Sequence, residues 1–133
     1  MIHKTLYLIR GLPGAGKSTI GMFLVGSTIC LHSADDYFMV PQAKGAPKYV
    51  FDAAKLPQAH KACLDAVKKN IIDGHPRIAV ANTFIKREHM QPYYDLADRN
   101  GYTVVEIIVK SNFKSIHNVP QEKIEQMRAE FEV

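Results

Sequence analysis

The chain has 133 residues, of which 47% are hydrophobic and 23% charged, the usage of an ordinary globular domain. This length predicts a single domain over residues 1–133, and the composition argues against a disordered chain or a coiled coil. With 17 Lys+Arg against 13 Asp+Glu the net charge is only +4, far from the dense basic stripes of proteins that coat DNA.

The two cysteines, Cys30 and Cys63, lie far apart and form no C-x-x-C pattern. They therefore predict neither a disulfide framework nor a cysteine-rich zinc site. No apolar run approaches the roughly 18 residues of a membrane span, and the first residues lead into a short strand rather than a signal-peptide core. We expect a soluble, cytoplasmic protein with reduced thiols and no membrane contact.

Short apolar runs and helical patterns alternate in the first half of the chain. A β-branched and aromatic run at 4–10 predicts a strand, residues 17–25 predict a helix closed by Gly26, and 28–32 predict a second strand. Residues 41–51 are rich in proline and glycine and indicate a loop or a frayed hairpin.

The same alternation continues in the second half. Residues 57–72 give the clearest helix, because small and apolar side chains recur at i, i+3, i+4 spacing. Residues 77–82 form the nearly unbroken apolar run of a strand covered on both faces. A helix over 87–100 follows, which Pro92 disturbs or makes start late, and then a strand over 103–109 and a last helix over 120–131. Strands that alternate with helices predict parallel βαβ units.

The strongest motif runs from Gly11 to Ser18, GLPGAGKS, and fits G-x-x-x-x-G-K-[ST] without a mismatch between a predicted strand and helix. Its glycines let the backbone direct N–H groups at a phosphate, and the following helix adds its positive end. Lys17 is placed to contact the β- and γ-phosphates, the Ser18 hydroxyl to bind Mg²⁺, and Thr19 to meet the α-phosphate. The residues expected to bind ATP or GTP are Gly11, Pro13, Gly14, Ala15, Gly16, Lys17, Ser18 and Thr19.

Two carboxylates, Asp35 and Asp36, follow the second predicted strand. Because ligands of parallel sheets bind at the carboxyl ends of the strands, both are expected on the same rim as the phosphate loop. A carboxylate there can accept the proton of a hydroxyl that attacks the γ-phosphate, which is kinase chemistry. Aspartate after a strand also commonly caps a turn, so both roles stay open for each residue.

Four elements together resemble the polynucleotide 5′-kinase-like branch of the P-loop kinases. They are the loop from Gly11 to Thr19, S-x-D-D-Y-F at 33–38, A-N-T at 81–83 and I-H-N-V-P at 116–120, so the resemblance covers essentially the whole chain. It implies an α/β fold, a doubly wound parallel sheet of about four to five strands with helices on both faces. It also implies ATP-dependent phosphotransfer, with Asp35 as the general base toward a nucleic-acid or nucleotide 5′-hydroxyl.

Three features depart from the family pattern. Phe38 stands where an arginine often holds the acceptor, residues 81–84 contain no carboxylate, and the lid between Val109 and Pro120 contains no arginine. Lysine cannot reproduce the bidentate fork of arginine, so this lid is not a conservative variant. The candidates for lid or acceptor contacts are Asp36, Lys86, Arg87, Lys114 and His117, although Lys86 and Arg87 also fit a solvated helix start.

These departures leave three functions open. The first is a Mg²⁺-dependent kinase for a nucleic-acid or nucleotide 5′-hydroxyl. The second is a nucleotide-binding regulatory module that has lost transfer activity, and the third is a kinase for the hydroxyl of a small molecule.

Two weaker patterns favour plain structural roles. His60 and Cys63 indicate an exposed histidine beside a core cysteine rather than a metal site, and Tyr93 and Tyr94 indicate helix packing rather than base stacking.

Overall fold

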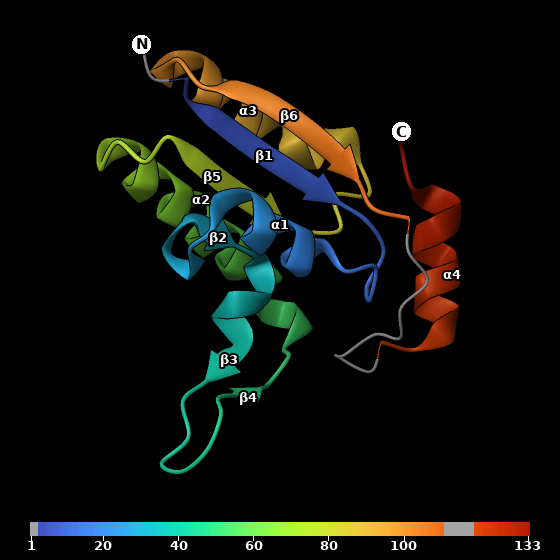
Figure 1. Ribbon diagram of the computed structural model, residues 1–133. Coiled ribbons are helices and arrows are strands. Elements are labelled where there is room, and N and C mark those ends of the chain that lie inside the picture. The colour runs from blue at the N-terminus through green and yellow to red at the C-terminus, as the bar shows by residue number, and fades with distance from the viewer. Residues whose placement is uncertain (1–2, 111–118) are drawn as a thin grey trace.

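The computed structural model describes residues 3–110 and 119–133. Its main sheet has four parallel strands in the order β2-β5-β1-β6 (Figure 1). Their bounds are Leu31–His32 for β2, Arg77–Ala81 for β5, Thr5–Arg10 for β1 and Thr103–Ile108 for β6. The predicted parallel α/β sheet is confirmed, and its central strand β1 leads directly into the phosphate loop.

Helices cover both faces of this sheet, with α1 in front of it and α2 and α3 behind in Figure 1. These helices span Lys17–Val25, Leu56–Ile72 and Gln91–Asn100. Side chains of β1 alternate between the two layers: Leu8 packs with the α2–α3 side and Ile9 with the α1 side, and both are fully buried. Burial on both faces explains why the central strands read as continuous apolar runs.

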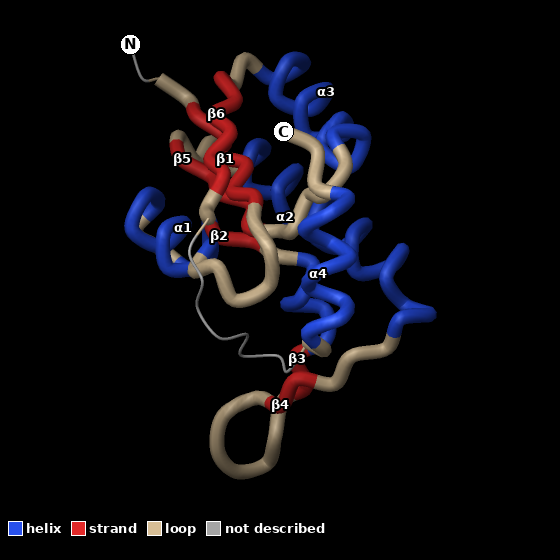
Figure 2. The backbone as a smooth tube through the Cα atoms, turned by 90° about the vertical axis from the view of Figure 1, so that its right-hand side faces the viewer, coloured by secondary structure: helices blue, strands red, loops and turns tan. Residues whose placement is uncertain are grey.

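A small antiparallel hairpin pairs β3, Met39–Val40, with β4, Lys48–Tyr49, and projects away from the main sheet (Figure 2). The prediction of a loop or frayed hairpin over 41–51 is confirmed. Phe38, only 3% exposed, anchors the hairpin by packing with Ala34 and Ala59.

The last helix, α4, spans Gln121–Glu130 and stands beside the carboxyl ends of β1 and β6 (Figures 1 and 2). After it, the chain turns back, and the backbone N–H of Glu132 donates to the carbonyl of Ile85 at 2.8 Å. The C-terminal residues therefore pack against the loop that follows β5.

Two predicted elements are shorter in the structure than in the prediction. Thr28–Cys30 forms a 3-10 turn, because the Ser27 hydroxyl accepts from the backbone of Ile29 and caps it, so only Leu31–His32 pairs as a strand. Arg87–Met90 is likewise a 3-10 turn, and α3 begins only at Gln91. The late start caused by Pro92 is the one that the sequence predicts, because proline fits the first turn of a helix but not its interior.

Arg10, the last residue of β1, is fully buried although it is charged. Its guanidinium donates to the carbonyl of Phe84 at 3.2 Å from Nε and 2.9 Å from Nη2, and Nη1 lies 3.3 Å from Glu106 Oε1. It also donates to the carbonyl of Glu132 and lies 4.7 Å from the ring centre of Phe131. Arg10 thus ties the strand before the phosphate loop to β6 and to the C-terminal residues.

The variant Arg10→Met is expected to lower the free energy of unfolding by about 2–4 kcal/mol, because it leaves the buried carbonyl of Phe84 without its donor and removes one of the two arginines paired with Glu106. Urea unfolding followed by circular dichroism measures this loss. Arg99→Met, on the exposed side of α3, is the control and should stay within about 0.5 kcal/mol of the parent. A loss for Arg10→Met no larger than for the control contradicts this role.

Candidate functional site

The phosphate loop connects β1 to α1 at the carboxyl edge of the sheet. Gly16 precedes α1 with φ 91°, a left-handed conformation that favours glycine and lets the next N–H groups turn inward. A Cβ on Gly11 would lie 2.6 Å from the backbone oxygen of Val109, so only glycine fits where the loop passes the end of β6. The glycines of the motif are therefore required by this backbone geometry.

Lys17 folds back over its own loop. Its Nζ donates to the carbonyl of Gly11 at 2.8 Å and to that of Leu12 at 3.0 Å. Burial lowers the pKa of Lys17 to about 8, and the negative charge of Asp35 opposes this shift only in part. Ser18 and Thr19 are exposed in the first turn of α1. The loop thus brings together a desolvated cation, two hydroxyls and a helix N-terminus, a combination that can bind an anion.

The two aspartates take different positions on a 3-10 turn at Ala34–Phe38. The Ser33 hydroxyl accepts from the N–H of Asp35 at 3.2 Å, and Asp36 Oδ2 accepts from the N–H of Ser33 at 3.1 Å. This is a capping box, so Asp36 holds the turn. Asp35 is exposed, and its charge acts on Lys17 across the site.

Tyr49 of β4 connects the hairpin to Asp35, because its hydroxyl donates to Asp35 Oδ1 at 3.2 Å. Burial, together with the charge and hydrogen bond of Asp35, raises the pKa of Tyr49 to about 12. The phenol therefore keeps its proton near neutral pH and remains a donor that orients the carboxylate.

Asn82, just beyond β5, fixes the turn that carries Asp35. It is 7% exposed, and its Oδ1 accepts from the N–H of Ala34 at 2.8 Å and from the Ser33 hydroxyl at 3.3 Å. Its Nδ2 donates to Cys63 Sγ at 3.8 Å. The stretch 81–84, which lacks a carboxylate, thus contributes an amide that positions the aspartate turn against the sheet.

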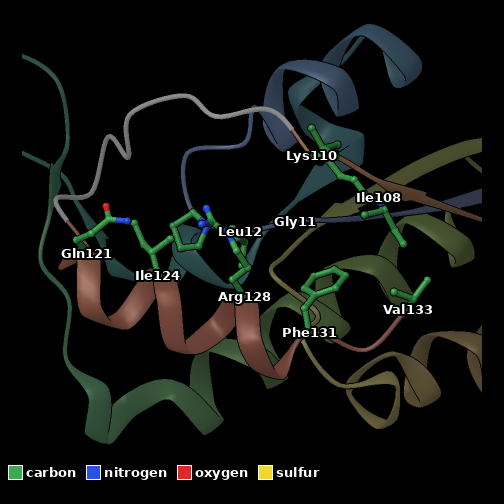
Figure 3. A pocket seen from close by; sticks show the side chains of 11 residues that line it. Gly11, Leu12, Ile108, Lys110, Gln121, Ile124, Arg128, Phe131 and Val133 are labelled. Carbon is green, nitrogen blue, oxygen red and sulfur yellow. The ribbon is translucent and has the colours of Figure 1, made fainter.

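A pocket of about 500 Å³ lies between the start of the phosphate loop, the end of β6 and α4 (Figure 3). Ile124, Arg128 and Phe131 line it from the C-terminal part of the chain, and Leu12 and Pro13 line it from the phosphate loop. Arg128 is half exposed and lies 3.0 Å from Glu125. An arginine is therefore present beside the phosphate loop, supplied by α4 rather than by the segment between Val109 and Pro120.

None of the remaining candidates for lid or acceptor contacts that the structure describes lines the pocket beside the phosphate loop. Arg87 forms a bidentate ion pair with Glu106, at 2.8 Å and 3.1 Å, and so belongs to the cluster around Arg10. Lys86 is half buried and directly precedes the turn at Arg87–Met90. Lys114 and His117 lie outside the residues that the structure describes.

The weaker patterns have structural roles. His60 is exposed while Cys63 is buried, and within residues 3–110 and 119–133 no group of three or more His, Cys, Asp or Glu side chains could hold a metal. Tyr93 packs edge-on against Phe84, with ring centres 5.6 Å apart, which confirms helix packing. No helix in the described part of the chain has the length and apolar character needed to cross a membrane.

Comparison with known proteins agrees with this architecture. The chain is 31% identical over 137 residues to human NEDD4-binding protein 2 and 28% identical over 114 residues to 2′,3′-cyclic-nucleotide 3′-phosphodiesterase of Pongo abelii. These alignments cover 95% and 84% of this chain but only 8% and 25% of the relatives, so the chain spans a small part of their length.

Two solved structures share the fold. Kti12 of Chaetomium thermophilum in complex with ADP-AlF3 superposes with a TM-score of 0.60 at 15% identity, over 96% of this chain and 80% of that one. The APS kinase CysC of Mycobacterium tuberculosis gives 0.53 at 12% identity, over 100% of both chains. A family model described as an AAA domain matches residues 6–116. The chain therefore belongs to this AAA domain family of P-loop proteins, as a polynucleotide 5′-kinase-like member.

Proposed function

We propose that this chain transfers the γ-phosphate of ATP to a hydroxyl group, and that the acceptor is a nucleic-acid or nucleotide 5′-hydroxyl. The observation that carries the proposal is that the turn with Asp35 follows β2 while the phosphate loop follows β1, so both lie at the same carboxyl edge of the parallel sheet. The negative charge of Asp35 also acts on Lys17. A donor site for a triphosphate and a base for an acceptor hydroxyl thus lie together, which is the arrangement that phosphoryl transfer needs.

The donor side consists of the residues from Gly11 to Thr19. The loop N–H groups and the start of α1 hold the phosphates, and Lys17 exchanges its two carbonyl partners for phosphate oxygens. Ser18 fits Mg²⁺, because this ion needs few protein oxygens and takes its other ligands from phosphates and water. When bound, Mg²⁺ offsets the charge on the transferring phosphate.

The acceptor side is Asp35. In the proposed reaction the hydroxyl oxygen forms a bond to the γ-phosphorus, the bond from that phosphorus to the β,γ-bridging oxygen breaks, and ADP leaves. The hydroxyl proton moves to the Asp35 carboxylate, which Tyr49 orients through its hydrogen bond. Arg128, which lines the pocket beside the loop, is the candidate cation for the transferring phosphate.

The two alternatives predict different products from γ-labelled ATP. We expect label in a 5′-hydroxyl oligonucleotide and less in nucleosides or small alcohols. Transfer only to a small alcohol would support a small-molecule kinase, and nucleotide binding with no labelled acceptor would support a regulatory module. Either of those results contradicts the proposal.

The lowered pKa of Lys17 predicts that ATP affinity depends on pH. Above about pH 8 the unliganded protein loses the Lys17 proton, whereas bound phosphate stabilises the ammonium, so ATP binding must take up a proton above that pH. We expect affinity to fall as the pH rises from 8 to 9.5. Calorimetry at pH 9 in buffers of different ionisation enthalpy measures the uptake, which Lys17→Arg should abolish. Equal heats in all buffers for the parent protein contradict this prediction.

A further inference from the structure

The β3–β4 hairpin exposes a group of apolar side chains close to Asp35. Five large apolar residues of this segment are each between 39% and 52% exposed: Tyr37, Met39, Val40, Val50 and Phe51. Large apolar side chains exposed together in one short segment are uncommon on a folded domain unless they bind something.

The aromatic rings of the hairpin have a fixed arrangement around buried Phe38. Phe51 packs against Phe38 with ring centres 5.1 Å apart, and Tyr49 meets Phe38 edge-on at 6.2 Å. The rings of Tyr49 and Phe51 are nearly parallel, inclined by 18° with centres 6.4 Å apart. The N–H of Val50 donates to the carbonyl of Phe38 at 2.8 Å and fixes the second strand. Phe51 is thus positioned by a buried ring while 52% of its surface stays exposed.

Tyr49 links this aromatic surface to the proposed chemistry. The ring of Tyr49 lies nearly parallel to the ring of Phe51, and the hydroxyl of Tyr49 donates to the Asp35 carboxylate at 3.2 Å. A planar group that stacks on Phe51 would therefore have a neighbouring hydroxyl within reach of Asp35. A protein or membrane that only buried the apolar side chains would not need the link from Phe51 through Tyr49 to Asp35.

The positive charge of residues 39–51 favours a planar ligand that also carries negative charge. Residues 39–51 include Lys44 and Lys48 and no aspartate or glutamate, and both lysines are exposed. Aromatic side chains next to lysines are the usual combination for single-stranded nucleic acid, because bases stack on the rings while the cations meet the phosphates. The segment thus combines both requirements in a short stretch beside Asp35.

We propose that the β3–β4 hairpin binds the acceptor, a single-stranded oligonucleotide whose first nucleobase stacks on Phe51 while its 5′-hydroxyl lies at Asp35. Lys44 and Lys48 face the phosphates that follow. This inference rests on the proposed function and specifies the acceptor class for the same site.

Steady-state phosphorylation of two oligonucleotides tests this inference, one complete and one abasic at its first nucleotide. We expect the abasic oligonucleotide to have a KM roughly 5- to 150-fold higher, the range that loss of one base stack gives. Phe51→Ala and Phe51→Leu should raise KM for the complete oligonucleotide similarly and remove the difference between the two substrates. Phe51→Trp should keep the difference in KM between the two substrates, because tryptophan can also stack on a base. All variants should retain the KM for ATP.

The matched control is Phe23→Ala, which removes a phenylalanine that is 90% exposed on α1, away from the hairpin, and should leave both KM values unchanged. Thermal unfolding checks that every variant folds. If the parent protein phosphorylates both oligonucleotides with the same KM, and Phe51→Ala matches the parent, the inference is wrong while the proposed function stands. If the parent protein transfers phosphate to no hydroxyl acceptor, both are wrong.

Discussion

Asp35→Asn is expected to lower the rate of phosphotransfer by about 10²–10⁴-fold, because the amide cannot accept the proton of the attacking hydroxyl. Affinity for ATP should change little, since the donor phosphates are held by the loop from Gly11 to Thr19. The substitution keeps the size of the side chain and an oxygen that can accept from Tyr49, so the turn should stay in place. Single-turnover transfer and calorimetric titration of ATP measure the two effects separately.

Asp98→Asn is the matched control for this variant, because Asp98 is exposed on α3 and its replacement removes the same charge. It should leave transfer unchanged. Equal turnover in Asp35→Asn and the parent protein would remove Asp35 from the mechanism. A loss of ATP affinity that accounts for the whole effect would assign Asp35 to the donor side.

Lys17→Met is expected to reduce kcat by about 10²–10³-fold, the loss that follows removal of one charged donor to a transferring group. ATP affinity should fall as well, because the ammonium contacts the phosphates before transfer. Lys17→Met should also raise the free energy of unfolding of the unliganded protein. The ammonium is desolvated in the unliganded protein, and methionine has no charge to desolvate.

The stability effect has a defined dependence on pH. Because the pKa of Lys17 is about 8 in the folded protein and 10.5 ordinarily, the unfolded state binds more protons between these values. Stability of the unliganded parent should therefore rise with pH through this window, and Lys17→Met should lose that rise. Lys68→Met, at an exposed position of α2, is the control and should keep it. An identical pH profile for Lys17→Met and the parent contradicts the burial of this cation.

The phosphate loop was predictable because its requirements are local. A contiguous motif between a strand and a helix specifies the backbone turn that the structure shows, with Gly16 in a left-handed conformation before α1. The position of Asp35 at the edge of the sheet was predictable by one further rule, that the carboxyl ends of parallel strands share an edge. The same rule does not say which of two adjacent aspartates caps the turn. That depends on the hydrogen bond from the Ser33 N–H to Asp36, which only the three-dimensional structure reveals.

Residues that support the site through long-range contacts were not predictable in their roles. Tyr49 lies 14 positions from Asp35, and Asn82 lies 49 positions from Ser33, so their contacts depend on how the hairpin and β5 are placed. Arg10 and Glu106, which are 96 positions apart, meet because β1 and β6 are neighbours. Arg128 lies in α4, beyond the segment between Val109 and Pro120 where the family pattern places its arginines, so its position beside the phosphate loop depends on how α4 packs.

The proposed transfer of phosphate from ATP to a hydroxyl is tested most directly by following the γ-phosphate of labelled Mg-ATP in single turnovers with a 5′-hydroxyl oligonucleotide, alongside the same oligonucleotide already phosphorylated at its 5′ end. We expect stoichiometric label on the 5′-hydroxyl strand, none on the blocked strand, and a loss of transfer in Asp35→Asn. Bound ATP whose label stays on the nucleotide or passes only to water, with the 5′-hydroxyl strand unlabelled, would contradict it.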